Sequence, residues 1–387
     1  MIVLQIIQII LLIYLGFASL YIFIFGFASL FPVRKKNDSS SDMRRYAVLI
    51  PGYKEDQVII EVAEDATNQD YPSDLYDVII IADSFKKETL DILRKLPIKV
   101  IEVSFDLSTK SKALNKAMAQ LPDIYDVALV LDADNLMEKS FITKINNAFN
   151  TGYIAVQGHR VAKNYNTPFA ILDAISEEVN NKIFRKGHRV LGFSAALIGS
   201  GMAMDYNYFK KMMKSIKAVG GFDKEIELQM LKEGIRIEYL NEAIVYDEKV
   251  QKAAVFSNQR KRWLSAQLHY FSLDFLTSLK HLILYGNYDY FDKAIQFVQP
   301  PRVMLLGLLF IINIISVFVN PIGWIYIWMG VLLICILTFI ITIPTRFYNL
   351  NTLKAVFTLP KAFYLILLSL LKIKGANKKF IHTEHGT

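Results

Sequence analysis

An apolar run that ends in two closely spaced carboxylates constrains this chain more than any other feature. Tyr125–Leu131 reads as a buried parallel strand, and Asp132-Ala133-Asp134-Asn135 follows where the run stops. In open α/β sheets, ligands bind at the edge formed by the carboxyl ends of the strands. Two hard oxygen ligands there suit Mg²⁺ or Mn²⁺, which would carry the phosphates of a ligand. An acidic loop after a strand also fits this motif, and so does a phosphatase with an aspartyl nucleophile, although Asn135 departs from the Thr or Val expected there.

Short apolar runs alternate with stretches of helical spacing on both sides of this motif. Such alternation is typical of a mainly parallel sheet with helices on both faces. We therefore expect an α/β fold in which Pro51–Tyr53, Asp83 and Asp132–Asp134 meet at one edge of the sheet. The predicted strands are Tyr46–Ile50, Tyr76–Ile81 and Ile98–Val103, and the predicted helices are Val58–Thr67, a stretch ending at Leu96, and Lys110–Leu121.

The chain is more apolar than an ordinary soluble domain, because 53% of its 387 residues are hydrophobic and its mean hydropathy is +0.29. Met1–Phe31 carries no charge and is long enough to span a bilayer with some tilt. It lacks the basic start of a cleavable signal peptide, so we expect a retained anchor. Val303–Val319 and Ile322–Ile343 are separated only by Asn320 and Pro321, which predicts a tight transmembrane hairpin.

Basic residues mark one side of these apolar runs. Arg302 and Arg346 border the hairpin, and by the positive-inside rule they lie in the cytoplasm together with the α/β part. Ala355–Leu371 is interrupted by Lys361 and followed by a basic tail, so we expect an interfacial helix there rather than a fourth crossing. The basic residues after the first run are Arg34, Lys35, Lys36, Arg44 and Arg45, and those of the tail are Lys372, Lys374, Lys378 and Lys379.

The net charge of +8 is largely juxtamembrane, so membrane lipids rather than nucleic acid are the expected partners. Cys335 is the only cysteine, which excludes a disulfide or a cysteine-based metal site within the chain. We expect an integral protein of a bacterial-type plasma membrane. Its predicted parts are an anchor at 1–31, a basic linker at 32–44, the cytoplasmic α/β domain at 45–273, an amphipathic interfacial region at 274–302, the hairpin at 303–343, and an interfacial helix with a basic cytoplasmic tail at 344–387.

Seven short motifs occur in a fixed order across residues 46–265. They are Val48-Leu49-Ile50-Pro51-Gly52-Tyr53-Lys54-Glu55, Asn68-Gln69-Asp70-Tyr71-Pro72, Ile81-Ala82-Asp83, Lys112-Ala113-Leu114-Asn115, Asp132-Ala133-Asp134-Asn135, Gly199-Ser200-Gly201 and Gln259-Arg260-Lys261-Arg262-Trp263. With hydrophobic segments on both sides, this ordered set resembles the membrane-anchored family 2 glycosyltransferases, which include cellulose-, hyaluronan- and ceramide-glycosylating enzymes. The resemblance implies a Rossmann-like GT-A fold, a nucleotide sugar as donor, and Mg²⁺ or Mn²⁺ as cofactor.

The resemblance also implies roles for single residues. Tyr53 resembles the aromatic residue that packs on a uracil face, and Asp83 resembles the carboxylate that accepts a hydrogen bond from the base. Glu55 contacts the nucleoside or is a solvated loop acid. Asp134 is the expected metal ligand, and Asp132 faces the ribose or the metal.

The diphosphate and the acceptor have their own expected contacts. Lys112 would place a positive charge near the diphosphate, with Lys110 as the alternative because the family more often has Lys-Gly where this chain has Lys-Ser-Lys. Arg262 would bind diphosphate oxygens bidentately. The expected contacts to the acceptor or product are Gly201, Gln259 and Trp263.

The catalytic base is expected near Gly220-Gly221-Phe222-Asp223-Lys224-Glu225-Ile226-Glu227-Leu228. Aligning Ile226-Glu227-Leu228 with the family's apolar–acidic–Leu continuation puts Glu225 at the position of the family's aspartate. A carboxylate there would remove the proton from an acceptor hydroxyl. Asp223 and Glu227 remain rivals, and the acids also suit a helix N-terminus.

The leading hypothesis is an inverting transferase that moves a sugar from a nucleotide sugar, a UDP-sugar, to a lipid or glycan acceptor at the cytoplasmic membrane face. A processive polysaccharide synthase that also secretes its product is the first alternative, and a non-catalytic membrane scaffold with the same fold is the second. The pairs His159-Arg160 and His188-Arg189 are expected to be surface or interfacial residues.

Overall fold

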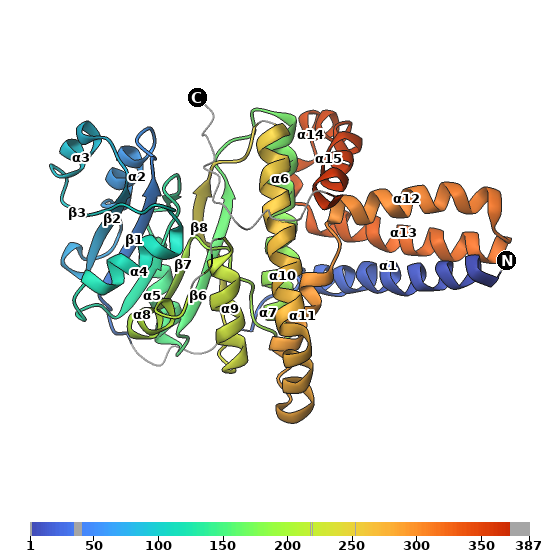
Figure 1. Ribbon diagram of the computed structural model, residues 1–387, viewed down its shortest axis with the longest axis horizontal. Helices are drawn as coiled ribbons and strands as arrows, with labels where there is room; N and C mark the ends of the chain where they lie inside the picture. Colours follow the sequence, from blue (N-terminus) through green and yellow to red (C-terminus); the bar gives the residue numbers. More distant parts are fainter. Residues whose placement is uncertain (1, 35–40, 217, 219, 252, 372–387) are drawn as a thin grey trace.

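The computed structural model describes residues 2–34, 41–216, 218, 220–251 and 253–371. An α/β domain stands at one end, a group of apolar helices stands at the other, and long helices lie between them (Figure 1). The predicted basic tail from residue 372 onward falls outside the described residues, as do Lys35 and Lys36.

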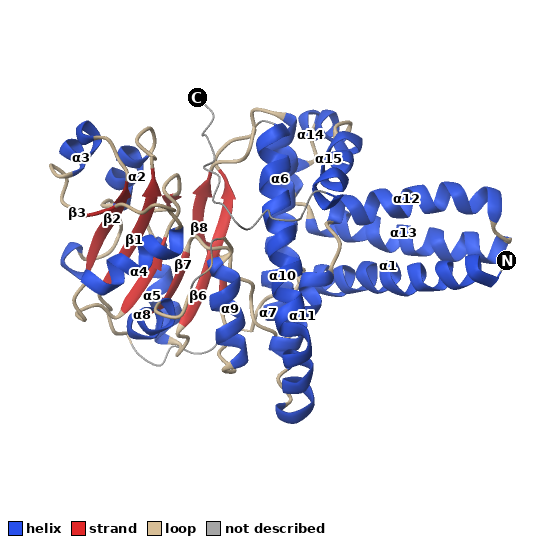
Figure 2. Cartoon of the chain, in the orientation of Figure 1, coloured by secondary structure: helices blue, strands red, loops and turns tan. Residues whose placement is uncertain are grey.

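The α/β domain is built on one eight-stranded sheet with the strand order β3-β2-β1-β4-β7-β6-β8-β5 (Figure 2). The four strands β3, β2, β1 and β4 are parallel to one another, as predicted. β7 is antiparallel to both β4 and β6, so the sheet is mixed beyond β4. The strands are β1 (Tyr46–Tyr53), β2 (Tyr76–Asp83), β3 (Lys99–Val103), β4 (Val127–Val130), β5 (Leu136–Met137), β6 (Ala155–Ala162), β7 (Met202–Asp205) and β8 (Glu238–Asp247).

Helices cover both faces of this sheet. Side chains of a strand alternate between its two faces, so Val48 and Ile50 pack with one buried cluster while Leu49 packs with the other. The first cluster includes residues of α2, α3 and α5, and the second includes residues of α4, α8 and α9. The helices of the domain are α2 (Ile59–Ala66), η1 (Ser73–Leu75), α3 (Lys87–Leu93), α4 (Lys110–Gln120), α5 (Phe141–Asn150), α8 (Tyr206–Met213) and α9 (Phe222–Lys232).

A layer of long helices connects the sheet to the apolar helices, and α6 and α10 run across the direction of α12 and α13 (Figure 1). α10 has 33 residues, so the predicted domain boundary at residue 273 falls inside a continuous helix. This layer holds α6 (Pro168–Asn180), a π-helix η2 (Asn181–Gly187), α7 (His188–Val190), α10 (Ala253–Tyr285) and α11 (Tyr288–Val298).

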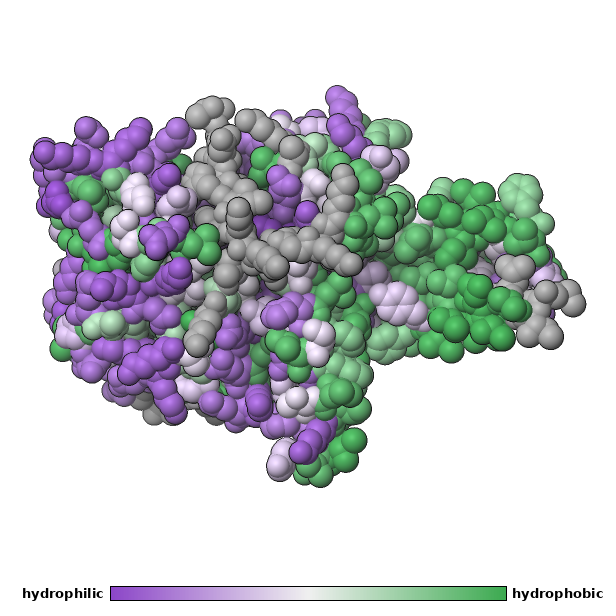
Figure 3. Space-filling model, in the orientation of Figure 1, coloured by the Kyte–Doolittle hydropathy of each residue, from purple (hydrophilic) through white to green (hydrophobic). Residues whose placement is uncertain are grey.

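Among the described residues, three unbroken helices are long and apolar enough to cross a membrane: Gln5–Ala28, Arg302–Val319 and Ile322–Thr342. They match the predicted anchor and hairpin, and they form the continuous hydrophobic surface on the right of Figure 3. The segment predicted as an interfacial helix, Ala355–Leu371, consists mainly of one helix, Leu359–Leu371. This helix is bent by 45° from the preceding helix Leu350–Val356, and the two together are apolar enough to form a broken fourth span. The elements are α1 (Ile2–Ala28), α12 (Arg302–Val319), α13 (Ile322–Thr342), η3 (Thr345–Phe347), α14 (Leu350–Val356) and α15 (Leu359–Leu371).

His188 was expected at a surface or interface, but this prediction is wrong. The residue is buried between α1 and the layer of long helices. Its ring is fully buried, stacks on Phe25 of α1 with 3.6 Å between the ring centroids, and lies 3.0 Å from the hydroxyl of Tyr21. Asp292 of α11 lies 3.1 Å from the same ring. A Cβ at the neighbouring Gly187 would lie 2.0 Å from the carbonyl oxygen of Phe25, so only glycine allows this close approach.

Candidate active site

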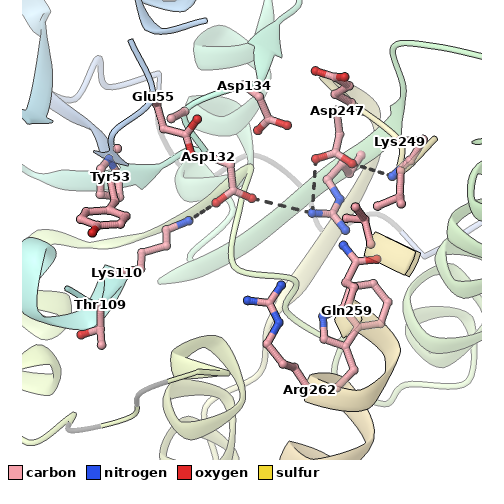
Figure 4. A pocket seen from close by; sticks show the side chains of 18 of the residues that line it. Tyr53, Glu55, Thr109, Lys110, Asp132, Asp134, Asp247, Lys249, Gln259 and Arg262 are labelled. Atoms are coloured by element: carbon pink, nitrogen blue, oxygen red, sulfur yellow. Dashed lines mark hydrogen bonds and ion pairs between the residues drawn. The ribbon is translucent and has the colours of Figure 1, made fainter. Parts of the chain in front are cut away.

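A pocket of about 310 Å³ lies where the carboxyl ends of β1, β2 and β4 meet, as the sequence predicted (Figure 4). Lys54 and Ser84 follow β1 and β2 with φ of 57° and 61°, in the left-handed region that non-glycine residues rarely adopt. These turns end the strands sharply beside the pocket. The lining residues that the sequence had singled out are Tyr53, Glu55, Asp83, Lys110, Asp132, Asp134, Gln259, Arg262 and Trp263.

Tyr53 and Asp83 end adjacent strands and are direct partners in the β1–β2 register. Asp83 is buried, and the Ser84 hydroxyl donates a hydrogen bond to its Oδ1 at 2.9 Å. The Lys54 ammonium lies 5.2 Å from the centroid of the Tyr53 ring. An aromatic face and a fixed carboxylate therefore stand together at one end of the pocket.

Three carboxylates converge at the other end of the pocket. Asp132, Asp134 and Asp247 each offer an oxygen within 4.8 Å of the other two. The buried amide of Asn135 donates to Oδ1 of Asp134 at 2.9 Å and to Oδ1 of Asp247 at 3.0 Å. Ser200 accepts a hydrogen bond from the Asp132 backbone at 2.9 Å and donates to the Asn135 side chain. Asn135 and Ser200 thus hold the three carboxylates in place.

This carboxylate cluster fits a divalent cation. Three oxygen ligands from different carboxylates are the donor set that Mg²⁺ and Mn²⁺ prefer, and their mutual repulsion favours a cation between them. Two of these residues were predicted, whereas Asp247 was missed. Its sequence signal was the same as that of Asp132, an acid at the end of an apolar run, here in β8.

Cations surround the three carboxylates. Arg160 Nη1 lies 3.6 Å from Asp247 and 3.8 Å from Asp132, and Lys249 Nζ lies 2.6 Å from Asp247. Although burial alone would raise it, Arg160 and Lys249 hold the pKa of the Asp247 carboxyl below its usual range. Arg160, expected near the surface with His159, is instead a half-buried residue that lines the pocket.

Glu177 of α6 forms ion pairs with these cations. Its carboxylate lies 2.8 Å from Arg160 and 3.6 Å from both Lys249 and Arg185. Burial alone would raise the pKa of the Glu177 carboxyl, but the three positive charges outweigh burial and lower it well below its usual range. Glu177, Arg160 and Lys249 were not predicted as site residues, because nothing in their local sequence distinguishes them from surface charges.

The structure places Lys110, and not Lys112, in the pocket. Lys110 forms an ion pair with Asp132, and its ammonium donates to the carbonyl of Gly199 at 2.7 Å. Lys112 is exposed, and its ammonium donates to the carbonyl of Leu107 at 2.8 Å. The physical reason is helix phase: Thr109 caps α4, so residues 110 and 112 point to different sides.

A second pocket of about 410 Å³ adjoins the first and shares Lys110, Asp132 and Arg262 with it. Asp223 lines this second pocket from the first turn of α9, and its Cβ lies close to Gly199. Gly221 precedes the helix with φ of 76°, which lets the chain turn abruptly into it.

The other two acids of α9 lie elsewhere. Glu225 is not among the residues that line either pocket. Glu227 is buried, lies 2.7 Å from the Lys293 ammonium, and accepts a hydrogen bond from the backbone of Leu197. Burial raises the pKa of Glu227 and Lys293 opposes that shift. Asp223 is therefore the acid of this segment that faces the space beside the carboxylate cluster.

α10 supplies Gln259, Arg262 and Trp263, which line both pockets. Burial lowers the pKa of the Arg262 guanidinium. Gln259 Oε1 is buried and accepts no hydrogen bond within the described part of the chain. Arg260 lies over the Trp263 ring, 4.4 Å from its centroid, and pairs with Asp173.

Gly201, expected beside an acceptor, directly precedes β7 and lines neither pocket. Its carbonyl accepts a hydrogen bond from the Gly158 backbone at 2.7 Å, and a Cβ there would lie 3.0 Å from Val245. Its neighbours contact the site instead, Gly199 through Lys110 and Ser200 through Asp132.

Several known proteins are similar in sequence to this chain. A protein of Bacillus subtilis (strain 168) called "Probable glycosyltransferase YdaM" is 23% identical over 315 residues, which cover 76% of this chain and 73% of that protein. The β-monoglucosyldiacylglycerol synthase of Synechocystis sp. is 24% identical over 246 residues, 60% of this chain but only 50% of the synthase.

A solved structure shares the fold. The mannosyltransferase PcManGT from Pyrobaculum calidifontis, in complex with GDP-Man and Mn²⁺, superposes with a TM-score of 0.54 and 15% identity, covering 87% of this chain and 99% of that one. This likeness confirms the GT-A-like α/β fold expected from the sequence. The family model described as "Glycosyltransferase like family 2" matches residues 44–266. The chain therefore belongs to glycosyltransferase family 2 and is a glycosyltransferase.

Proposed function

We propose that the protein moves one sugar, with inversion, from a UDP-sugar to a hydroxyl of a membrane-associated acceptor at the cytoplasmic face. The observation that carries this proposal is the convergence of Asp132, Asp134 and Asp247 in the pocket that also holds Tyr53 and Arg262. Two parts of a nucleotide sugar, the nucleoside and the diphosphate, each have a chemically matched surface in this pocket.

The nucleoside end of the donor fits Tyr53 and Asp83. The tyrosine ring offers a flat surface to a uracil ring, and stacking of this kind contributes about 1–3 kcal/mol. The fixed Asp83 carboxylate accepts a hydrogen bond from the base. Glu55 also lines the pocket, and its proposed contact is with the nucleoside.

The diphosphate fits the space between the carboxylate cluster and two cations. Asp132, Asp134 and Asp247 would hold Mg²⁺ or Mn²⁺, and the bound ion would neutralise charge on the leaving diphosphate. PcManGT, which shares the fold, was solved with Mn²⁺. Lys110 and Arg262 border the same space and bind phosphate oxygens directly.

Asp223 is the proposed base. The acceptor hydroxyl gives its proton to the Asp223 carboxylate while its oxygen forms a bond to the anomeric carbon. The bond between that carbon and the diphosphate breaks, and the diphosphate leaves with the electron pair. A single displacement of this kind inverts the anomeric centre. Glu225, the residue that the alignment had favoured, remains the alternative, but only Asp223 lines the second pocket.

The apolar helices and their basic flanks support the proposed location. α1, α12 and α13 cross the membrane in this proposal, and Arg44, Arg45 and Arg346 lie on the cytoplasmic side. The Synechocystis relative is named for a glucosylated diacylglycerol, which agrees with an acceptor that resides in the bilayer.

The test is a screen of nucleotide sugars with purified protein in lipid nanodiscs, reading release of the nucleoside diphosphate and incorporation of labelled sugar into extracted lipid. The proposal expects both signals with one UDP-sugar and neither with Asp134→Ala. A wild-type protein that binds and turns over no UDP-sugar, in the presence of Mg²⁺ and Mn²⁺, would refute it.

A further inference from the structure

An apolar cavity of about 440 Å³ lies between the helical layer and the membrane helices, apart from the two pockets described above. Its size falls within the roughly 300–1,000 Å³ typical of small-molecule sites. It is bordered by α6, η2 and α10 on one side and by α13, α14 and α15 on the other. Representative lining residues are Ile175, Phe184, Leu264, Ile340, Val356 and Ile366.

This cavity adjoins the catalytic site through shared side chains. Trp263 lines the apolar cavity and both catalytic pockets. Phe184 and Gln296 line the cavity and also the second pocket, which contains Asp223. A molecule with an apolar part in the cavity can therefore extend its other end past the Trp263 ring toward Asp223.

The cavity is also accessible from the side of the membrane helices. Ile340, Tyr348 and Val356 line it, and their exposed fractions are 54%, 58% and 42%. These residues belong to α13, to the turn after η3, and to α14, at the end of the membrane helices that adjoins the α/β domain (Figure 1). If these helices span the bilayer, an apolar lipid chain can enter the cavity from the bilayer at this end of the helices without passing through water.

Two polar side chains, Gln299 and Arg302, stand within this apolar lining. Gln299 Oε1 is buried and accepts no hydrogen bond within the described part of the chain. The guanidinium of Arg302 donates to Asn180 at 2.5 Å and to Ser176 Oγ at 3.0 Å. A lipid backbone with hydroxyl and ester groups offers a donor to the glutamine oxygen and acceptors to the guanidinium.

We propose that this cavity binds an acyl chain of a diacyl lipid with a free hydroxyl, and that this lipid is the sugar acceptor. The inference rests on the proposed function and adds the acceptor class and its site. In this arrangement the chain enters between α13 and α14, the glycerol backbone lies near Gln299 and Arg302, and the hydroxyl passes Trp263 to reach Asp223. A growing polysaccharide does not match this cavity, because its hydroxyl groups would be buried against apolar side chains without hydrogen-bond partners.

The first test fills the cavity. Ile340→Trp adds volume at its opening, and Ile327→Trp makes the same change on the same helix at a residue that is 45% exposed and does not line the cavity. For Ile340→Trp we expect the KM for a long-chain diacylglycerol to rise about tenfold or more. The KM for a short-chain diacylglycerol and for the nucleotide sugar should change little, and Ile327→Trp should match wild type. Equal KM values for the long-chain acceptor in the two variants would overturn the inference.

The second test locates the lipid without relying on turnover. A diacylglycerol with a photoreactive diazirine at the end of one chain is crosslinked to the full-length protein in nanodiscs, and the adducts are mapped by mass spectrometry. We expect adducts on the cavity residues of α6, α13 and α15, and we expect Ile340→Trp to suppress them. Adducts confined to outward-facing side chains such as Phe318 and Leu333 would overturn the inference. Binding of UDP-sugar is measured on the same samples, so loss of donor binding identifies failure of the proposed function instead.

Discussion

Asp247→Asn tests the carboxylate cluster at the residue that the sequence did not reveal. The change keeps the size of the side chain and one oxygen but removes one of three charges whose oxygens lie within 4.8 Å of one another. At an effective dielectric constant of about 20, two unit charges 4 Å apart attract by about 4 kcal/mol, and a divalent ion doubles that value. Loss of the Asp247 charge also leaves Lys249, 2.6 Å away, to repel the ion.

Ligand rearrangement and the remaining two carboxylates offset most of this loss. We therefore expect Mn²⁺ binding to weaken by about 3 kcal/mol, or roughly 10²-fold in affinity. Electron paramagnetic resonance of free Mn²⁺ measures the affinity directly, without any need for turnover. Asp123→Asn, which removes a carboxylate that is 67% exposed and pairs only with Lys210 among the described ion pairs, is the control. Wild-type Mn²⁺ affinity in Asp247→Asn, together with lost affinity in Asp134→Ala, would refute the three-carboxylate site.

Three further predictions concern other residues of the site. Asp223→Asn should slow transfer roughly 10²–10⁴-fold with donor binding retained, whereas Glu225→Gln should be mild; the reverse ranking in steady-state kinetics would restore Glu225 as the base. Lys110→Met should raise the KM for the nucleotide sugar about tenfold, and Lys112→Met should leave it unchanged, since only Lys110 lines the pocket. The folded-state pKa of Glu177 is depressed, so its contribution to stability is present above its ordinary pKa of 4.5 and lost as pH falls below it. Thermal unfolding should therefore show a smaller loss of stability between neutral pH and pH 4 in Glu177→Gln than in wild type.

The sheet and its edge were predictable because they rest on local patterns. Val48 and Ile50 alternate with Leu49 across two buried clusters, and this period of two is visible in the sequence. Asp83 and Asp132 follow such runs directly, so parallel strands had to bring them to one edge. The helix α1 was equally predictable, because a charge-free apolar run of this length is typical of a helix that spans a membrane.

The remaining site residues depend on topology that the local sequence does not encode. Asp247 reaches the Asn135 amide across 112 positions of sequence, and it does so because β8 pairs with β6 on the far side of β7. The predicted helix already began at Lys110, as α4 does, but which of Lys110 and Lys112 faces the pocket depends on how α4 packs against the sheet. The pattern of apolar runs also did not indicate that β7 is antiparallel to its neighbours β4 and β6.

The proposed function requires metal-dependent transfer of a sugar at the carboxylate cluster. The most direct measurement follows labelled sugar from a UDP-sugar into diacylglycerol in nanodiscs, for wild type and Asp134→Ala, with EDTA and after Mn²⁺ is restored. We predict transfer by wild type, its loss in EDTA, its recovery with Mn²⁺, and a loss of about two orders of magnitude or more in Asp134→Ala under all conditions. Transfer that continues at the wild-type rate both in EDTA and in Asp134→Ala would contradict the account.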